Sequence, residues 1–192
     1  NSFFYYEDKF GSLKLPLPNI LGQFQLENIS SAIATLRMIN IGIKDEQIKE
    51  GIKNIKNVAR LQEIKVGKLK ELIKNNQLIL DGSHNEDGAR VLNEYLETLD
   101  CNIHVIIGMM ANKDHEKFIS YFKDISSLTT VDIPNQPNSI SGLELKEKFK
   151  SIPNVQYKKN IKEAIKSIPL KENDLILVTG SLYLSGEFLK LN

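Results

Sequence analysis

After residue 60, short apolar segments alternate regularly with segments of helical periodicity. Segments 77–80, 104–107 and 175–179 are rich in Leu, Ile and Val, as is typical of buried strands, and helical patterns separate them. This alternation predicts a mostly parallel sheet with helices on both faces, joined by right-handed crossovers. We therefore expect a Rossmann-like, doubly wound α/β domain from about residue 62 to the end.

The other elements of this domain follow the same pattern. We expect further strands at 62–66, 128–133 and 155–157. We expect helices at 87–99, 115–122, 142–149, 161–168 and from about 182 onward.

The first part of the chain has a different organisation. Residues 2–6 and 12–17 favour a β-hairpin, and residues 27–39 and 45–55 carry apolar side chains at the three-and-four spacing of helices. One hairpin and two helices leave apolar faces uncovered, so we expect an incomplete domain. Because the sequence starts at Asn1, we expect the tail of a longer polypeptide.

Charge and cysteine content narrow the possible partners. Twenty-five Lys and Arg face 24 Asp and Glu, a net charge of +1, which gives no reason to expect a nucleic-acid partner. No apolar run approaches the roughly 18 residues that span a bilayer, so we expect no membrane association. The single cysteine, Cys101, cannot form an internal disulfide and fits a reducing compartment, and we expect a cytoplasmic protein.

Three polar segments directly follow predicted strands. They are 81–85 (DGSHN), 108–114 (GMMANKD) and 179–181 (TGS). In doubly wound sheets, ligands bind beyond the carboxyl ends of the strands, so these segments should share one edge. Together they offer a carboxylate, an imidazole, an amine, a hydroxyl and helix N-termini, which predicts a site for a small polar anion.

Four stretches in order resemble motifs of the folylpolyglutamate synthase and dihydrofolate synthase family, a branch of the Mur ligases. These are residues 21–28 (LGQFQLEN), 59–62 (ARLQ), 81–85 (DGSHN) and 180–187 (GSLYLSGE). The sequence departs from the family pattern at Ala59, where the family has glycine, and at Ser83, where it has alanine.

The resemblance implies a domain organisation. Residues 1–57 would be the C-terminal part of the central ATPase domain, 58–62 the interdomain linker, and 63–192 the Mur ligase C-terminal domain. No Gly-rich loop ending in Gly-Lys-Ser or Gly-Lys-Thr occurs in the 192 residues. The phosphate-binding loop and the Mg²⁺ ligands are therefore expected upstream, and we expect the 192 residues alone to be inactive.

The resemblance also implies an activity. Members of the family use ATP to activate a folate carboxylate as an acyl phosphate and then join it to the amino group of L-glutamate. The pterin substrate would be dihydropteroate, tetrahydrofolate or both, and the full-length enzyme a monomer.

The resemblance assigns three residues to nucleotide binding. Asn28 would hold the adenine through its amide, Arg60 would reach the ATP phosphates, and Asp81 would accept hydrogen bonds from the ribose. The alternatives are a helix N-cap for Asn28, a solvated linker charge for Arg60 and a helix cap for Asp81.

The resemblance assigns four residues to binding or reaction of the amino-acid substrate. His84 and Ser181 would act as catalytic residues facing L-glutamate or the phosphorylated intermediate, with Asn85 and Lys113 as further substrate ligands. The alternatives are a loop histidine, a helix N-cap at Ser181 and a surface ion pair between Lys113 and Asp114.

Two other functions stay open. The chain could belong to another Mur-type amino-acid ligase, against which the GSLYL ending speaks, or it could be a stand-alone nucleotide- or amino-acid-binding module without catalysis. The remaining histidines, His104 in an apolar strand and His115 on a helix, are given no role in the site.

Overall fold

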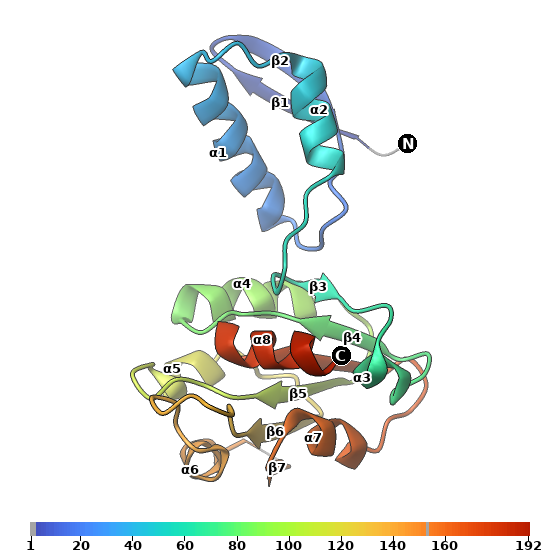
Figure 1. Ribbon diagram of the computed structural model, residues 1–192, viewed down its shortest axis with the longest axis vertical. Helices are drawn as coiled ribbons and strands as arrows, with labels where there is room; N and C mark the ends of the chain where they lie inside the picture. The colour runs from blue at the N-terminus through green and yellow to red at the C-terminus, as the bar shows by residue number, and fades with distance from the viewer. Residues whose placement is uncertain (1–2, 153) are drawn as a thin grey trace. The chain divides into compact units, whose positions relative to one another are not determined.

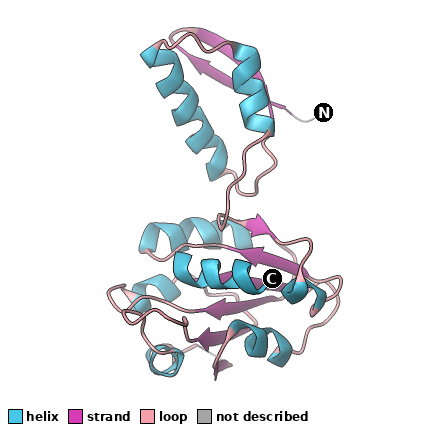
Figure 2. Ribbon diagram, in the orientation of Figure 1, coloured by secondary structure: helices cyan, strands magenta, loops and turns pink. Residues whose placement is uncertain are grey.

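The computed structural model describes residues 3–152 and 154–192 and divides the chain into two compact units, the first ending at Val58 and the second beginning at Ala59. Figure 1 labels the elements along the chain and Figure 2 separates helices from strands. Within the described residues, no helix has the length and apolar character needed to span a membrane.

The first unit consists of a hairpin and two helices. Its elements are β1 (Phe3–Asp8), β2 (Gly11–Pro16), α1 (Phe24–Ile39) and α2 (Asp45–Lys53). The predicted hairpin and both helices are confirmed, apart from Ser2, which lies outside the described residues. Helix α1 begins three residues earlier than predicted, so Asn28 lies inside the helix and the alternative of a helix N-cap at this position is wrong.

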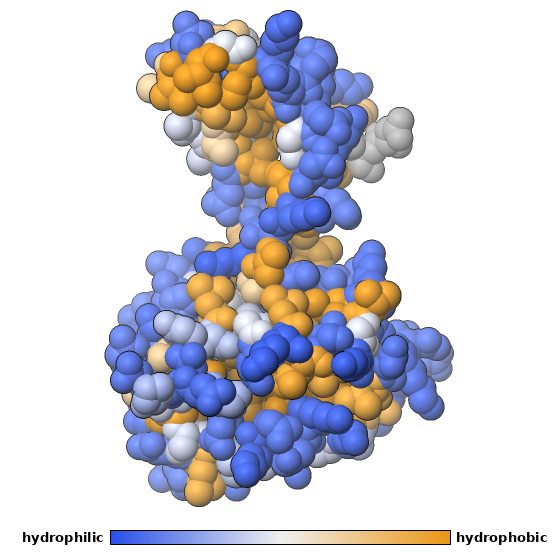
Figure 3. All heavy atoms as spheres, viewed as in Figure 1, coloured by the Kyte–Doolittle hydropathy of each residue, from blue (hydrophilic) through white to orange (hydrophobic). Residues whose placement is uncertain are grey.

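This unit packs a small core of its own, which corrects part of our expectation. Leu15 of the hairpin, Ile33 of α1 and Ile52 of α2 are buried together with four further apolar residues. Apolar side chains nevertheless stay exposed around the end of α1 and the following loop, among them Met38 and Ile41. Figure 3 shows hydrophobic surface over this part of the unit.

The second unit is built on a six-stranded sheet with the strand order β3-β4-β8-β5-β6-β7. Its strands are β3 (Gln62–Glu63), β4 (Gln77–Leu80), β5 (Ile103–Ile107), β6 (Ser127–Val131), β7 (Val155–Lys158) and β8 (Leu175–Thr179). Only the short β3 pairs antiparallel, and the other five strands are parallel. The predicted fold class, a mostly parallel doubly wound sheet, is confirmed.

Helices cover both faces of this sheet. They are α3 (Lys68–Glu71), α4 (Glu86–Leu96), α5 (His115–Ile119), α6 (Gly142–Lys148), α7 (Ile161–Ser167) and α8 (Leu182–Leu191). Helices α3, α7 and α8 share one apolar core with β4, β5, β6 and β8, and α7 and α8 lie on the near face in Figure 1. Helix α3 was not predicted. Its first amides are capped by Asn192, which accepts from the N–H groups of Leu69 and Lys70 at 3.1 and 3.2 Å.

The strand order explains how the helices are distributed. The chain runs from β4 across to β5, β6 and β7 in one direction, and then returns to place β8 between β4 and β5. With right-handed crossovers, the return connection lies on the opposite face from the outward ones. The chain that leaves β8 therefore turns toward one face of the sheet, while the chain that leaves each neighbouring strand, β4 and β5, turns toward the other face. A crevice opens between these diverging connections.

Candidate functional site

The three segments predicted to share the carboxyl edge of the sheet do meet there. The Gly180 N–H donates to the Ser83 carbonyl at 3.0 Å, and the Gly108 N–H donates to the Thr179 carbonyl at 3.4 Å. Gly180 has a φ of +102°, and a Cβ at this position would lie 2.8 Å from the Gly108 carbonyl oxygen. The segment after β8 is thus held between the two neighbouring loops by a backbone that only glycine fits.

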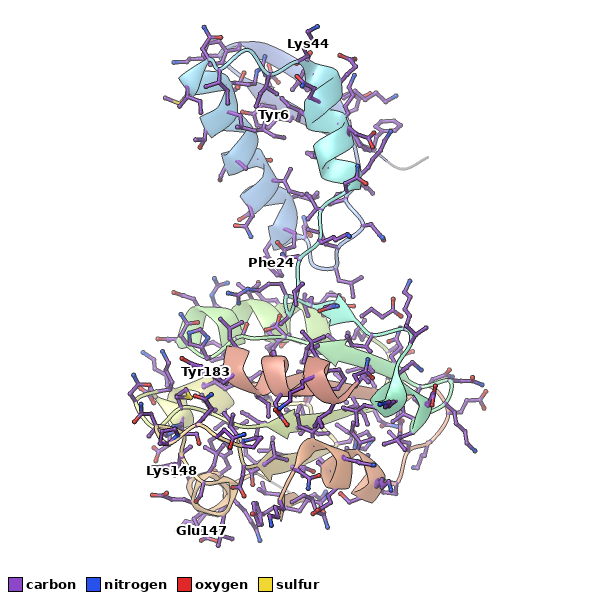
Figure 4. The ribbon with its side chains drawn as sticks, in the orientation of Figure 1. Tyr6, Phe24, Lys44, Glu147, Lys148 and Tyr183 are labelled. Carbon is purple, nitrogen blue, oxygen red and sulfur yellow. The ribbon has the colours of Figure 1, made fainter. Side chains whose placement is uncertain are left out.

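A cleft of about 640 Å³ opens above these strand ends. It contains three of the predicted site residues, His84, Lys113 and Ser181. The other lining residues are Met110, Ala111, Asn112, Pro137, Asn138, Leu182 and Tyr183. Tyr183 stands at the beginning of α8 and is labelled in Figure 4.

The imidazole of His84 has one nitrogen engaged. Its Nδ1 lies 2.9 Å from the carbonyl oxygen of Gly82. Because a carbonyl oxygen only accepts hydrogen bonds, Nδ1 must carry the proton. In the neutral ring, Nε2 then keeps its lone pair and can accept a hydrogen bond or a proton in the cleft.

Ser181 is the N-cap of α8, which was one of the two roles expected for it. Its Oγ accepts from the N–H of Tyr183 at 3.1 Å, and the residue is 2% exposed. The hydroxyl proton is left to donate to an acceptor in the cleft. The positive end of the α8 dipole lies at the same place, so this part of the cleft favours an anionic group.

Lys113 lies in the loop before α5 and is half-buried. Its neighbour Asp114 caps α5 by accepting from the Lys117 N–H at 3.0 Å. No ion pair joins Lys113 to Asp114 in the part of the chain that the structure describes, so that alternative is wrong. His115 shapes the loop, since its Nε2 lies 3.0 Å from the Met110 carbonyl, which can only accept.

Asp81 is buried, and both of its carboxylate oxygens are engaged with backbone. One oxygen accepts from the Leu61 N–H and the other from the Ser83 N–H, both at 2.8 Å. The residue is 3% exposed. The Gly82 N–H reinforces this link by donating to the Ala59 carbonyl at 2.8 Å. Asp81 therefore ties residues 59–61 to the loop that carries His84.

Residues 59–61, which Asp81 holds, have an unusual backbone conformation. Ala59 and Leu61 have φ values of 53° and 46°, in the left-handed region that non-glycine residues rarely adopt. Glycine, which the resemblance implies at position 59, would adopt this conformation without a steric penalty. Arg60 is half-buried between these two residues, and the structure gives its guanidinium no hydrogen bond within the described chain.

The two predicted asparagine ligands differ in position. Asn85 caps α4, where its side-chain oxygen accepts from the Gly88 N–H at 3.0 Å. Asn28 belongs to the first unit, is exposed on α1, and donates to the Gln25 side-chain oxygen at 3.3 Å. Gln25 is buried and also receives the Asn57 amide at 3.4 Å.

The loop after β6 forms a wall of the cleft that sequence reasoning missed. The Ala111 N–H donates to the Asn138 carbonyl at 2.9 Å, and the Ile140 N–H donates to the Met109 carbonyl at 3.2 Å. The signal was present, because residues 134–138 (PNQPN) follow a predicted strand and so lie at the same carboxyl edge.

Two further features bear on the chemistry. Among the described residues, no group of three or more His, Cys, Asp and Glu side chains is placed to hold a metal ion. Cys101 lies outside the cleft, and burial together with the nearby carboxylates of Asp174 and Asp100 raises the pKa of its thiol.

The fold and the cleft define a doubly wound α/β domain with an open cleft at the carboxyl ends of its parallel strands, the edge at which such sheets commonly bind ligands. The chain belongs to the Mur ligase family, and residues 67–182 match the family described as "Mur ligase, glutamate ligase domain".

Individual relatives agree with this family. The chain is 25% identical to the folylpolyglutamate synthase of Lacticaseibacillus casei, over 95% of this chain and 42% of that protein. The solved structure of the folylpolyglutamate synthase of Thermotoga maritima matches with a TM-score of 0.74 and 28% identity, over 95% of this chain and 43% of that one.

A third comparison shows the fold alone. The Yersinia pestis bifunctional folylpolyglutamate synthase/dihydrofolate synthase, solved with AMPPNP and a Mn ion, matches with a TM-score of 0.75 and 19% identity. That match covers 98% of this chain and 45% of the solved one. The chain thus spans less than half the length of each of these three proteins.

Proposed function

We propose that this chain is the C-terminal part of an ATP-dependent ligase that joins L-glutamate to dihydropteroate, tetrahydrofolate or both. The observation that carries the proposal is the cleft that gathers His84, Lys113 and Ser181 inside a segment of the glutamate ligase family. The names of the relatives, folylpolyglutamate synthase and dihydrofolate synthase, support a folate substrate.

Glutamate offers two carboxylates and an ammonium group, and the cleft has a complement for each. The Lys113 ammonium can pair with one carboxylate. The Ser181 hydroxyl and the N-terminus of α8 can hold the other. The free Nε2 of His84 can accept from the ammonium group, orient it and take one of its protons before the amine attacks.

The other residues that the resemblance assigned are proposed to act mainly in ATP binding. ATP would supply the phosphoryl group that activates the folate carboxylate, together with a divalent cation such as Mg²⁺. The AMPPNP and Mn ion bound in the Yersinia pestis structure support this part of the proposal. Arg60 would contact the phosphates and Asn28 the adenine. Asp81 would contribute through its oxygens' remaining lone pairs and through the position it gives to residues 59–61. Asn85 would donate its amide to substrate while its oxygen caps α4.

The bonds and protons exchanged in the ligation step define the chemistry that the cleft must provide. The uncharged amine of glutamate attacks the acyl phosphate, the C–N bond forms, and the bond to phosphate breaks. The ammonium loses one proton before attack, and the nitrogen loses a second as the amide forms, which the departing phosphate can take. The Nε2 of His84 is a basic nitrogen in the cleft that can take the first of these protons.

The test uses the polypeptide as cells make it, with its size established by intact mass. Wild-type protein should incorporate radiolabelled L-glutamate into dihydropteroate or tetrahydrofolate, with one ADP released per amide bond. His84→Ala should raise the KM for glutamate about tenfold or more, the loss expected for one hydrogen bond to a charged group. Arg60→Ala should act on the KM for ATP instead.

Other outcomes assign the alternatives. Incorporation of a different amino acid into a non-folate acid would make this another Mur-type ligase. A native product of only 192 residues that binds glutamate without turnover would make it a binding module. An unchanged KM for ATP in Arg60→Ala would remove the nucleotide role of that residue.

A further inference from the structure

A side-chain bridge joins the first residue of α4 to α5 and to Tyr121, which follows α5. One carboxylate oxygen of Glu86 accepts from the Tyr121 hydroxyl at 2.8 Å, and the other lies 2.6 Å from the Lys117 ammonium. Hydrogen bonds from Lys117 and Tyr121 outweigh partial burial and lower the pKa of Glu86, so the carboxylate is charged at neutral pH. The bridge uses both oxygens of a single side chain.

The bridge residues lie close in sequence to two residues that line the cleft. Glu86 is the first residue of α4 and follows His84 by two residues. Lys117 belongs to the first turn of α5, and its backbone N–H is capped by Asp114, the residue after Lys113. The bridge therefore connects the loop that carries His84 with the loop that carries Lys113.

A second ion pair on the same helix offers a comparison. Arg90 and Glu94 pair at 2.7 Å one turn further along α4, in a similarly exposed setting. Both partners belong to α4, so this pair does not restrain α5. Exposed ion pairs contribute little to stability in either case. The difference between the two pairs lies in which elements they connect.

We propose that Glu86 is a positioning residue whose bridge to Lys117 and Tyr121 fixes the separation of His84 and Lys113, and so sets the affinity of the cleft for its amino-acid substrate. The inference rests on the proposed function. His84 approaches the ammonium of glutamate and Lys113 approaches a carboxylate, so the distance between their loops must match the length of the amino acid. A mismatch of about 1 Å at such a site is costly.

The first experiment follows the bridge without any substrate. The backbone amide resonances of His84 and Lys113 are compared in ¹H–¹⁵N spectra of the wild-type 192-residue chain, Glu86→Gln and Glu94→Gln. The Gln at position 86 keeps an acceptor for Tyr121 but loses the charge that holds Lys117. We expect both resonances to shift in Glu86→Gln and to stay in place in Glu94→Gln.

The second experiment measures glutamate kinetics in the complete enzyme. Glu86→Gln should raise the KM for L-glutamate about threefold to tenfold, with kcat within about twofold of wild type. Lys117→Met should have a similar effect, and the double variant should be no worse than either single one because both remove the same bridge. Glu94→Gln should match wild type.

The outcomes separate this inference from the function on which it rests. Unshifted His84 and Lys113 resonances in Glu86→Gln, or a glutamate KM equal to that of wild type, would overturn the positioning role. Additive effects of Glu86→Gln and Lys117→Met would overturn it as well. A wild-type enzyme that ligates no glutamate, with the resonances shifted as expected, would overturn the proposed function while the coupling of the two loops stands.

Discussion

His84 and His104 lie at opposite ends of the same sheet, in two very different settings. His84, at the carboxyl edge, has one nitrogen on a backbone carbonyl and the other available to the cleft. His104, at the amino edge, has Nδ1 2.8 Å from the Ser127 hydroxyl and Nε2 3.2 Å from the Asp174 carboxylate. The same side chain can thus serve a ligand at one edge and a closed network at the other.

The network around Asp174 shows what a closed edge requires. Asp174 is 1% exposed and also accepts from the Asn102 amide at 2.8 Å and from the Lys171 N–H at 2.6 Å. Its carboxylate joins the segments that precede β5 and β8, and His104 extends the link to β6. Buried polar groups hold structure together when every member has a partner, whereas a binding site keeps groups available for a ligand.

The largest effect we expect comes from removing the centre of this network. Asp174→Ala leaves the Lys171 N–H, the Asn102 amide and His104 without their acceptor in a buried setting. The free energy of unfolding should fall by about 4 kcal/mol, since each unsatisfied group costs about 1–3 kcal/mol. Urea denaturation followed by circular dichroism measures this. A loss below about 1 kcal/mol would show that Asp174 does not hold the amino edge of the sheet together.

The second prediction concerns the backbone at the open edge. Gly180→Ala combines an unfavourable positive φ with a clash against the Gly108 carbonyl, and should cost about 3 kcal/mol. Gly186, inside α8, has open space around it, and Gly186→Ala should be neutral or stabilise by up to about 1 kcal/mol. Thermal unfolding of both variants tests whether the backbone at the carboxyl edge is as tightly constrained as the network at the amino edge, even though His84 keeps a nitrogen available to the cleft. Equal melting temperatures would contradict this constraint.

The third prediction is the pH dependence of stability. Burial alone would raise the pKa of Asp174, but hydrogen bonds from Lys171, Asn102 and His104 outweigh it and lower the pKa below its ordinary value. A carboxyl group with a lowered pKa in the folded state stabilises the protein above its unfolded pKa of about 3.9, and this stabilisation is lost as pH falls through the folded value.

Scanning calorimetry between pH 6 and pH 3 tests this dependence. The melting temperature of wild-type protein should fall more steeply toward acid than that of Asp174→Asn, which has no charge to lose at this site. Parallel curves for the two proteins would mean that Asp174 contributes nothing to acid sensitivity.

The smallest expected effect on stability is at His84. His84→Ala removes one hydrogen bond to the Gly82 carbonyl at a half-buried loop position, and should change the free energy of unfolding by about 0.5 kcal/mol or less. The same urea titration used for Asp174→Ala provides the measurement. A loss above about 1.5 kcal/mol would assign His84 to the structure of the edge and weaken its proposed contact with glutamate.

Local patterns in the sequence predicted most of the fold. Strands β4 and β8 have the predicted bounds, because an unbroken run of buried aliphatic residues between polar loops has few other interpretations. The strand-end rule also predicted that the segments carrying His84, Lys113 and Ser181 would share one edge, and these three residues line one cleft. That rule works because parallel strands end at a common edge.

Contacts between distant parts of the chain could not be predicted in this way. His104 and Asp174 are separated by 70 residues, and Asn192 reaches α3 across 123 residues. The carboxylate of Asp81 holds Leu61, a partner that no local motif indicates. Such pairs depend on strand order, which the pattern of strands and helices leaves open.

The strand order has a consequence for how the second unit folds. Strands β4 and β5 each pair with β8 and not with each other, so the middle of the sheet is completed by a strand about 70 residues after β5 in sequence, β8 (Leu175–Thr179). During synthesis, β4 can find only its short antiparallel neighbour β3 until residues 175–179 have emerged. We therefore expect assembly of the sheet to depend on this long-range pairing, which favours slow folding and leaves the edges of β4 and β5 unpaired until β8 is available.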